Sequence, residues 1–366
     1  MTHSHRRDTL SDRIAAADLD ALLVTDLINV RYLSGFTGSN AALLVFADHR
    51  PAVLATDGRY RTQAGAQAPD LEVSIARAVA RHLGARAVGD GIRRLGFESH
   101  VVTVDAHDAL AAEVEPGATL VRAPGTVEAL REIKDAGEVA ALRRACMAAD
   151  AALHDLVDGG KLRAGRTERA VARDLEALLV DHGAIGPSFE TIVAAGPHSA
   201  IPHHRPTDAV LRTGDFVKID FGALVDGYHS DMTRTFVLGA AADWQRDLYA
   251  LVAAAQQAGL DTLAPGAALA DIDAAARTII ADAGHGERYP HGLGHGVGLQ
   301  IHEAPGINAS AAGRLQAGSA VTVEPGVYLP DRGGVRIEDT VIVENSGQTP
   351  EVLTRFPKEL AIVEET

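Results

Sequence analysis

The sequence has little cysteine, few basic residues relative to acidic ones, and no long apolar segment. Its one cysteine, Cys146, excludes a disulfide framework within the chain. Lysine and arginine number 34 against 49 aspartates and glutamates, a formal net charge of −15. This balance argues against a nucleic-acid partner, because such binding relies on basic side chains at phosphates. The longest apolar runs, such as residues 41–47, are strand-length and far short of the ~20 residues that span a bilayer.

The N-terminal twenty residues are polar and charged. They lack the apolar segment of a secretory signal peptide. Together with the single cysteine, this predicts a cytoplasmic protein with no membrane partner. We expect His3 and His5 to belong to a frayed terminus and residues 29–38 to form a glycine-rich loop.

The chain is long enough for two domains, since single cores rarely grow past ~250–300 residues. Short apolar runs alternate with helical stretches up to a turn cluster at residues 123–126, which predicts an α/β domain over 1–125. Residues 126–366 carry helices and strands in blocks and predict an α+β domain. In this domain the first helix is expected after a capping box at Asp135 and Glu138, and further helices at 167–182, 243–259 and 269–283. Strands are expected at 192–195, 216–221, 235–238, 321–323 and 336–343.

A weak internal repeat lies within the second domain. Residues 214–222 align with 318–326, so that glycines, apolar residues and an acid fall at the same five offsets. Downstream, residues 227–233 align with 334–340. Each half thus carries one acid at the end of an apolar strand and a second acid 11 or 14 residues later, namely Asp220 and Asp231, and Glu324 and Glu338. Chance similarity between short glycine-bounded strands is common, but four matching acids favour duplication around a shared centre.

Four carboxylates that converge in a core cannot all stay ionised without cations, so this pattern predicts divalent metal ions. Between the two acid pairs lies HGLGHGVGLQIHE, with His291, His295 and His302 among glycines that expose the rings. An oxygen-rich site with one imidazole suits Mn²⁺, Fe²⁺, Co²⁺ or Zn²⁺. A second cluster, His203-His204, precedes the first acid; adjacent residues of an extended chain face opposite ways, so we expect one of the two to point into the site.

The motifs IDFG, GYHSDMTRT, HGLGHGVGLQIHE, TVEPGVY and GGVRIED resemble those of the dinuclear metallopeptidases of pita-bread fold, family M24, which include methionine aminopeptidase, aminopeptidase P and prolidase. The segments NVRYLSGFTGS and TDGRYRTQA resemble the creatinase-type N-terminal domain of aminopeptidase P and prolidase. As a whole the chain is similar to the short actinobacterial Xaa-Pro peptidases of PepQ type, described as cytoplasmic dipeptidases. The resemblance implies a creatinase-like α/β domain followed by an α+β pita-bread domain with a pseudo-twofold repeat.

Residue by residue, the resemblance implies that Asp231 and Glu338 bridge two metals, that Asp220 binds one of them, and that His295 and Glu324 bind the other. It further implies that Glu324 shuttles a proton. The histidines that flank the substrate would be His203, His291 and His302. Family members often have glycine where this chain has His204, which leaves the role of that ring open.

The implied activity is hydrolysis of an Xaa-Pro bond at the N-terminus of dipeptides or short peptides, with manganese expected and zinc or cobalt as alternatives. We expect small proline-containing peptides as the partners and a homodimer with the 29–38 segment near the subunit contact. Dipeptidase and aminopeptidase activity both stay open, with Arg205 or a residue of a partner subunit as a possible carboxylate ligand. The alternatives are a methionine aminopeptidase-like enzyme, a creatinase-like enzyme, and a non-catalytic binding protein on the same fold.

Overall fold

The computed structural model describes residues 2–364, which form two units, one ending at Arg131 and one beginning at Glu132. The division falls after helix α6 (Glu128–Arg131) and not after residue 125. The helix belongs to the first unit because both its ends bond to Asn29. The Asn29 amide donates to Glu128 over 2.6 Å, and Arg131 Nη1 donates to the Asn29 side-chain oxygen over 2.9 Å.

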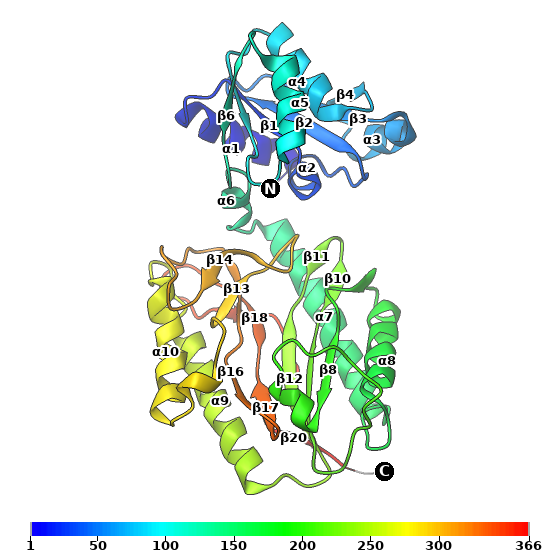
Figure 1. The fold of residues 1–366 in the computed structure, drawn as a ribbon, viewed down its shortest axis with the longest axis vertical. Helices are drawn as coiled ribbons and strands as arrows, with labels where there is room; N and C mark the ends of the chain where they lie inside the picture. Colours follow the sequence, from blue (N-terminus) through cyan, green and yellow to red (C-terminus); the bar gives the residue numbers. More distant parts are fainter. Residues whose placement is uncertain (1, 365–366) are drawn as a thin grey trace. The chain divides into compact units, whose positions relative to one another are not determined.

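The first unit is a six-stranded mixed sheet with helices packed against it, in strand order β4-β3-β2-β1-β5-β6 (Figure 1). The strands are the short apolar runs of the sequence, and β1 and β2 are buried along their whole length. Its strands are β1 (Ala21–Val24), β2 (Ala41–Phe46), β3 (Val53–Thr56), β4 (Glu72–Ile75), β5 (Arg94–Phe97) and β6 (Thr119–Arg122). Its other helices are α1 (His3–Ala16), α2 (Leu27–Ser34), α3 (Arg61–Gln67), α4 (Val79–Gly89) and α5 (Val104–Val114).

Two sequence predictions for this unit are wrong. The segment around His3 and His5 is not frayed but begins α1, because the Thr2 hydroxyl caps the helix by accepting from the backbone N–H of His5. Residues 29–34 are helical, as the larger part of α2, and a left-handed Gly35 ends that helix. The two helices hold each other in place, since Arg6 and Arg7 of α1 donate to the last carbonyls of α2.

The second unit consists of two halves, each a sheet covered by a pair of helices (Figure 1). In the first half, α7 (Ala136–Asp158) and α8 (Glu168–Asp181) cover the sheet β20-β12-β9-β8. Its strands are β8 (Ile192–Ala195), β9 (Phe216–Phe221), β12 (Met232–Leu238) and β20 (Ala361–Val363), with a small sheet of β7 (Gly186–Pro187), β10 (Ala223–Val225) and β11 (Tyr228–His229) beside them.

In the second half, α9 (Asp243–Asp261) and α10 (Leu269–Asp282) cover the sheet β14-β13-β15-β18-β19. Its strands are β13 (Gly294–Gly296), β14 (Glu303–Ile307), β15 (Ala320–Val323), β18 (Asp339–Ile342) and β19 (Glu351–Val352), with a two-stranded ribbon of β16 (Gly326–Leu329) and β17 (Gly333–Arg336). Each half buries its own apolar core between helices and strands. The arrangement matches the duplication that the sequence repeat predicted.

Helix starts follow their capping signals, and one predicted strand is broken. Asp135 and Glu138 form the capping box that opens α7. The strand expected over 336–343 is interrupted between β17 and β18, where the backbone N–H of Glu338 donates to the Thr233 carbonyl of the other half over 3.1 Å. Glu338 therefore lies where the two halves meet. Among the helices of the described residues, none has the length and apolar character that crossing a bilayer requires.

Candidate metal centre

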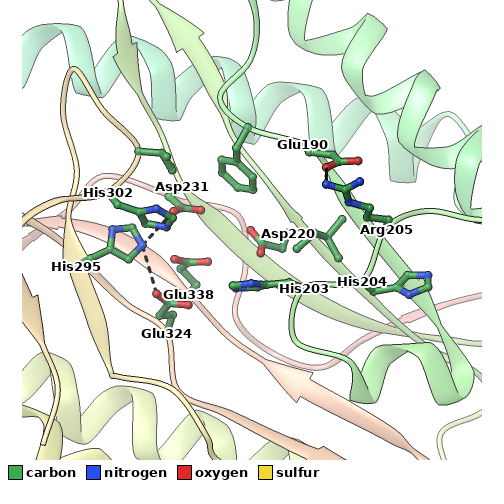
Figure 2. Close-up of a pocket in the computed structure, with 13 residues that line it drawn as sticks. Glu190, His203, His204, Arg205, Asp220, Asp231, His295, His302, Glu324 and Glu338 are labelled. Carbon is green, nitrogen blue, oxygen red and sulfur yellow. Dashed lines mark ion pairs between the residues drawn. The ribbon is translucent and has the colours of Figure 1, made fainter. Parts of the chain in front are cut away.

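The five predicted metal ligands come together where the two halves of the second unit meet. Asp220 lies in β9, Asp231 directly before β12, His295 in β13, Glu324 directly after β15, and Glu338 between β17 and β18. All five line one cavity of about 310 Å³, together with His203 and His302 (Figure 2). His291 lines an adjoining cavity that shares His203, His295 and His302 with the first.

The ligand atoms are spaced as atoms around a metal ion would be. One atom each of Asp231, His295 and Glu338 lie within 4.8 Å of one another. His295 Nε2 is 3.4 Å from Glu324 Oε1 and 3.6 Å from Asp231 Oδ2. Two ligands of the same metal, each ~2.1 Å from it, are separated by roughly 3–3.5 Å. The geometry therefore fits ligands arranged around a common point.

The buried carboxylates of this cavity lack enough positive charge around them, which favours the binding of cations. Burial, reinforced by repulsion from the neighbouring carboxylates, raises the pKa of both Asp231 and Glu338 well above the ordinary range. Burial also raises the pKa of Glu324 to about 8, although Arg336 opposes this shift. Asp220 Oδ1 is buried and has no hydrogen-bond partner in the described part of the chain. An orphaned carboxylate oxygen among acids that resist ionisation fits divalent metal ions, which would supply the missing partner and charge.

The buried guanidinium of Arg336 reaches this site, and a single positive charge does not neutralise four acids. Arg336 forms an ion pair with Asp220, and its Nε lies 3.9 Å from Glu324. The same guanidinium donates to the Tyr328 hydroxyl over 2.8 Å and to the Thr233 hydroxyl over 3.0 Å. It is thus held in place from several sides and orients Asp220. Burial lowers the pKa of His295 to about 4, which keeps the ring neutral as a metal ligand must be.

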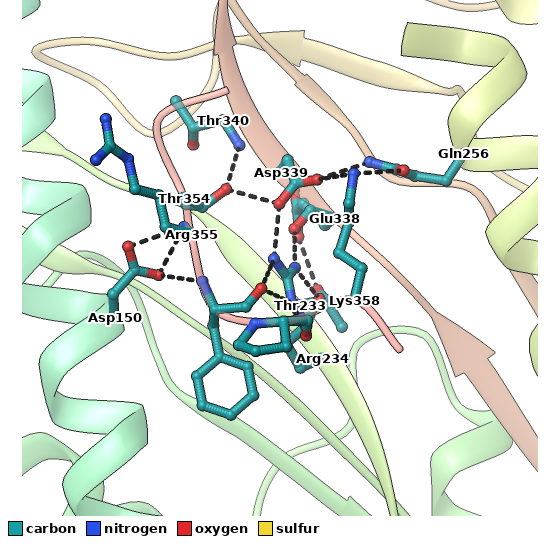
Figure 3. A network of polar contacts seen from close by, with 12 residues as sticks. Asp150, Thr233, Arg234, Gln256, Glu338, Asp339, Thr340, Thr354, Arg355 and Lys358 are labelled. Carbon is teal, nitrogen blue, oxygen red and sulfur yellow. Dashed lines mark hydrogen bonds and ion pairs between the residues drawn. The ribbon is translucent and has the colours of Figure 1, made fainter. Parts of the chain in front are cut away.

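The segment that carries Glu338, between β17 and β18, is held in place by a buried polar network (Figure 3). Arg234 Nη2 bonds to Asp339 Oδ1 over 2.7 Å, and Arg234 Nη1 donates to the Glu338 carbonyl. Asp339 also accepts from Gln256 and forms an ion pair with Lys358. Burial would raise the pKa of Asp339, but the charges of Arg234 and Lys358 outweigh it and lower that pKa. The backbone at Glu338 is therefore anchored by an ionised, fully bonded acid.

The two adjacent histidines face opposite ways, as alternation along the chain predicted. In Figure 2 His203 points toward the acids, whereas the ring of His204 turns away from them. His204 Nε2 lies 2.8 Å from Glu168 Oε2, and His198 Nδ1 lies 2.9 Å from Glu168 Oε1. The rings of His198 and His204 stack at 4.4 Å. The ring of His204 thus makes a buried contact with Glu168, while the residue still borders the cavity.

The other two histidines expected to flank the substrate have lowered pKa values. Burial, with the Arg336 charge, lowers the pKa of His291 to about 3, and the Nε2 of that ring lies 2.8 Å from the Tyr328 hydroxyl. Burial and the nearby His203 lower the pKa of His302. The His302 ring stands edge-on to that of His295 with 4.4 Å between centroids. Each neutral imidazole can both donate and accept a hydrogen bond at the cavity wall.

Sequence reasoning missed the residues that support the site. Glu168 lies in the first turn of α8, where an acid normally interacts with the helix dipole, so nothing in its position marks it. His198 lies five residues before His203, and its place in a histidine-rich segment was the available signal. Tyr328, which contacts both His291 and Arg336, is the last residue of the TVEPGVY motif, which was quoted without a role for its tyrosine.

Comparison with known proteins agrees with this geometry. Residues 140–345 match the model of metallopeptidase family M24, and residues 6–133 match the Creatinase/Prolidase N-terminal domain. The chain belongs to metallopeptidase family M24. It is 38% identical over 346 residues to the uncharacterized peptidase YqhT of Bacillus subtilis, covering 94% of this chain and 96% of that protein.

Two solved structures of similar proteins share the fold of this M24 chain throughout. An Xaa-Pro dipeptidase from Bacillus anthracis superposes with a TM-score of 0.92 at 37% identity, covering 98% of this chain and 99% of that one. An X-Pro aminopeptidase from Thermotoga maritima superposes with a TM-score of 0.89 at 31% identity, with the same coverage of 98% and 99%. The predicted creatinase-like domain and pita-bread domain are thereby confirmed.

Membership in this family also bears on the alternative interpretations. The match over residues 6–133 places the chain in the prolidase and aminopeptidase P branch, away from a methionine aminopeptidase without that domain. The five predicted metal ligands line one cavity, and one of them has an orphaned carboxylate oxygen, which fits a dinuclear divalent metal site. A metallo-exopeptidase is the class of enzyme that these findings support.

Proposed function

We propose that this M24 peptidase hydrolyses the Xaa-Pro bond at the N-terminus of dipeptides and short peptides. The observation that carries the proposal is the joint lining of one cavity by the acids and imidazole of the metal centre and by two further histidines, His203 and His302. Solved structures described as an Xaa-Pro dipeptidase and an X-Pro aminopeptidase share the fold over 98% of the chain. They support both the bond class and its position at the N-terminus.

In the proposed hydrolysis the metal ions and the protein side chains have different tasks. When bound by Asp220, Asp231, His295, Glu324 and Glu338, a pair of divalent metals supplies a polarised carbonyl and an activated water. Glu324, a carboxylate that lines this cavity, can take a proton from the attacking water and later release it. The leaving group of an Xaa-Pro bond is a secondary amine that must be protonated, and we assign the delivery of that proton to Glu324.

The histidines provide the selectivity for proline. An Xaa-Pro amide has no N–H, so a site that binds the substrate through that donor accepts it poorly. His203 and His302 line the cavity, and their ring N–H groups can donate to carbonyl oxygens instead. Among the apolar lining residues, Ile192 and Ile301 offer contacts for a proline ring.

The metal, the assembly and the compartment are further parts of this proposal. Manganese is supported by a donor set of four carboxylates and one imidazole, which suits hard divalent ions, with zinc or cobalt as alternatives. A homodimer is supported by the resemblance to dimeric family members. A cytoplasmic location is supported by the single cysteine, Cys146, which is buried and forms no disulfide.

The decisive experiment is hydrolysis of a matched peptide set by the Mn²⁺-loaded protein: Ala-Pro, Ala-Pro-Ala, Ala-Ala-Ala and Met-Ala-Ser. We expect cleavage of the proline peptides alone, and none by the Asp220→Ala control. Release of methionine alone would overturn the Xaa-Pro assignment. If the protein binds two metals but cleaves none of the peptides, it acts on another amide substrate. If it neither binds metal nor cleaves any peptide, a non-catalytic binding protein is favoured.

A further inference from the structure

Lys218 carries a buried amino group that the proposed hydrolysis does not use. The residue lies in β9, two positions before Asp220, and its exposed fraction is 0%. Alternate side chains of a strand share one face of the sheet, so Lys218 points to the same side as Asp220, whereas its neighbours Val217 and Ile219 pack in the apolar core of the first half. A lysine is rarely buried completely unless its amino group is bonded, so the bonding partners indicate its role.

The partners of this amino group are two successive backbone carbonyls. Lys218 Nζ donates to the Ile201 carbonyl over 2.7 Å and to the Pro202 carbonyl over 3.2 Å. The Pro202 oxygen belongs to the peptide unit that joins Pro202 to His203, and a peptide unit is planar. A bond to this oxygen therefore fixes the direction in which the backbone enters His203.

Two further buried side chains hold this arrangement in place. Arg336 Nη1 also donates to the Pro202 carbonyl, over 3.2 Å, and to the Tyr328 hydroxyl over 2.8 Å. Lys218 Nζ lies 5.0 Å from the centre of the Tyr328 ring. The amino group is thus enclosed by side chains that are themselves bonded, and it cannot move away from the two carbonyls without breaking this packing.

The backbone on the other side of His203 is fixed as well. The ring of the next residue, His204, bonds to the buried Glu168. His203 therefore lies between two anchored points of a segment that is neither helix nor strand. It lines both cavities of the metal centre, and in Figure 2 its ring points toward the acids.

The internal repeat provides an independent indication of what this position does. Residues 214–222 align with 318–326, so Lys218 takes the same offset as Thr322. The Thr322 hydroxyl accepts from the backbone N–H of His295 over 3.1 Å. In each half, therefore, the side chain two residues before the first acid bonds to the backbone of a segment that carries a histidine of the site.

We propose that Lys218 is a positioning residue for His203 in the cleavage of the Xaa-Pro bond. The inference rests on the proposed function, in which the ring N–H of His203 donates to a carbonyl oxygen of the substrate. Such a donor is effective only where it meets the charge that develops in the transition state, so its placement matters. Lys218 lines neither cavity and acts through the peptide units that precede His203.

The experiment is a double-mutant cycle in the Mn²⁺-loaded protein with Ala-Pro as the substrate. Lys218→Met keeps the length of the side chain and removes its donor; it is combined with His203→Ala and, separately, with His302→Ala. Lys218→Gln retains an N–H donor on a shorter side chain. The matched control is Arg6→Met, since Arg6 is also a buried base that donates to a backbone carbonyl, that of Tyr32, but lines neither cavity.

We expect Lys218→Met to lower kcat on the order of tenfold with KM near wild type, since a displaced donor is lost in the transition state. Added to His203→Ala, the change should lower kcat no further, because the group that it positions is gone. Added to His302→Ala, it should lower kcat by the same factor as in wild type. Lys218→Gln should restore part of the loss, and Arg6→Met should keep both kcat and KM.

Bound metal, counted by mass spectrometry of the native protein, should be two ions in every Lys218 variant. Equal losses of kcat on the His203→Ala and His302→Ala backgrounds would show that Lys218 supports the fold in general, and they overturn the inference alone. A wild-type kcat in both Lys218 variants does the same. If Lys218→Met does not fold, the cycle is run with Lys218→Gln and judged by the same criterion. A wild type that does not cleave Ala-Pro overturns the proposed function and the inference with it.

Discussion

The Thr233 hydroxyl donates to Glu338 Oε2 over 2.7 Å and so joins the two halves of the catalytic domain at the metal centre. The contact has a counterpart across the pseudo-twofold relation. Thr340, the residue that the repeat aligns with Thr233, donates to the backbone carbonyl of Asp231 over 2.8 Å. Each half therefore orients the second acid of the other, and the ligand set is complete where the halves meet.

Removal of the Thr233 hydroxyl should weaken metal binding. In Thr233→Val the shape of the side chain is kept, but Glu338 loses a buried donor, so its carboxylate is oriented less well. Loss of a partner that orients a ligand typically lowers metal affinity about ten- to a hundredfold. We expect a decrease of that size in a competition titration with a fluorescent chelator.

Thr262→Val is the matched control for this change. Its hydroxyl also bonds, to the Gly259 carbonyl over 2.7 Å, but at the end of α9, and it lines neither cavity of the metal centre. Equal metal affinity of Thr233→Val and wild type would show that the contact between the halves does not orient Glu338.

The stability of the metal-free protein should fall as pH rises. Burial raises the pKa of Glu324 from 4.5 to about 8 and raises those of Asp231 and Glu338 as well. Between these values the folded protein retains protons that the unfolded chain releases, so the free energy of unfolding decreases with pH. Metal binding expels those protons, so metal affinity should rise over the same range.

Melting temperatures of chelator-treated and Mn²⁺-loaded protein, compared from about pH 6.5 to about pH 8, check this linkage above the range in which the buried histidines contribute with the opposite sign. The stabilisation by metal should be largest at the upper end. Glu324→Gln, which cannot ionise, should flatten the slope of the metal-free protein. A metal-free protein that becomes more stable with pH would contradict the raised pKa values.

The acids of the metal centre were predictable because the repeat places each of them beside a glycine-bounded strand, a local pattern. Glu168 was not predictable, since it lies 36 residues from His204 and reads as an ordinary acid in the first turn of a helix. The Arg336–Asp220 pair spans 116 residues. Such contacts depend on how the two halves pack together. The hydrophobic periodicity of the sequence predicts helices and strands, but not which distant residues meet. The break before β18 likewise comes from the other half, through Thr233.

The cluster of Glu168, His198 and His204 should stabilise the fold without binding metal. Its ligand-type atoms lie within 4.8 Å of one another, as in the metal centre. However, Glu168 already accepts hydrogen bonds from Ala195, Thr207 and both histidine rings. Although burial opposes it, these donors lower the pKa of Glu168 to about 2, so the acid is ionised and its oxygens are satisfied.

In His204→Phe, stacking on His198 can persist but the buried carboxylate of Glu168 loses one donor. We expect a loss of about 1–3 kcal/mol in the free energy of unfolding by urea. His204→Gln keeps an N–H donor and should lose less. Bound metal, measured by mass spectrometry of the native protein, should be two ions in all three proteins. A third ion in wild type that is missing in His204→Phe would show that the cluster is a metal site.

His302 should act on the substrate and not on the metals. Its ring stands beside that of His295 and lines the cavity, but the group of ligand atoms within 4.8 Å includes His295 and not His302. Since burial and the neighbouring His203 lower the pKa of His302, the ring is neutral and can donate to a carbonyl oxygen that gains negative charge.

His302→Ala should therefore lower kcat/KM for Ala-Pro on the order of a hundredfold, the usual effect of removing one such donor. Metal content and affinity should equal those of wild type. His295→Ala, which removes an expected ligand from the same wall, is the contrasting variant and should lose metal. If His302→Ala also loses metal, the two rings share one role and the assignment of His302 to the substrate is wrong.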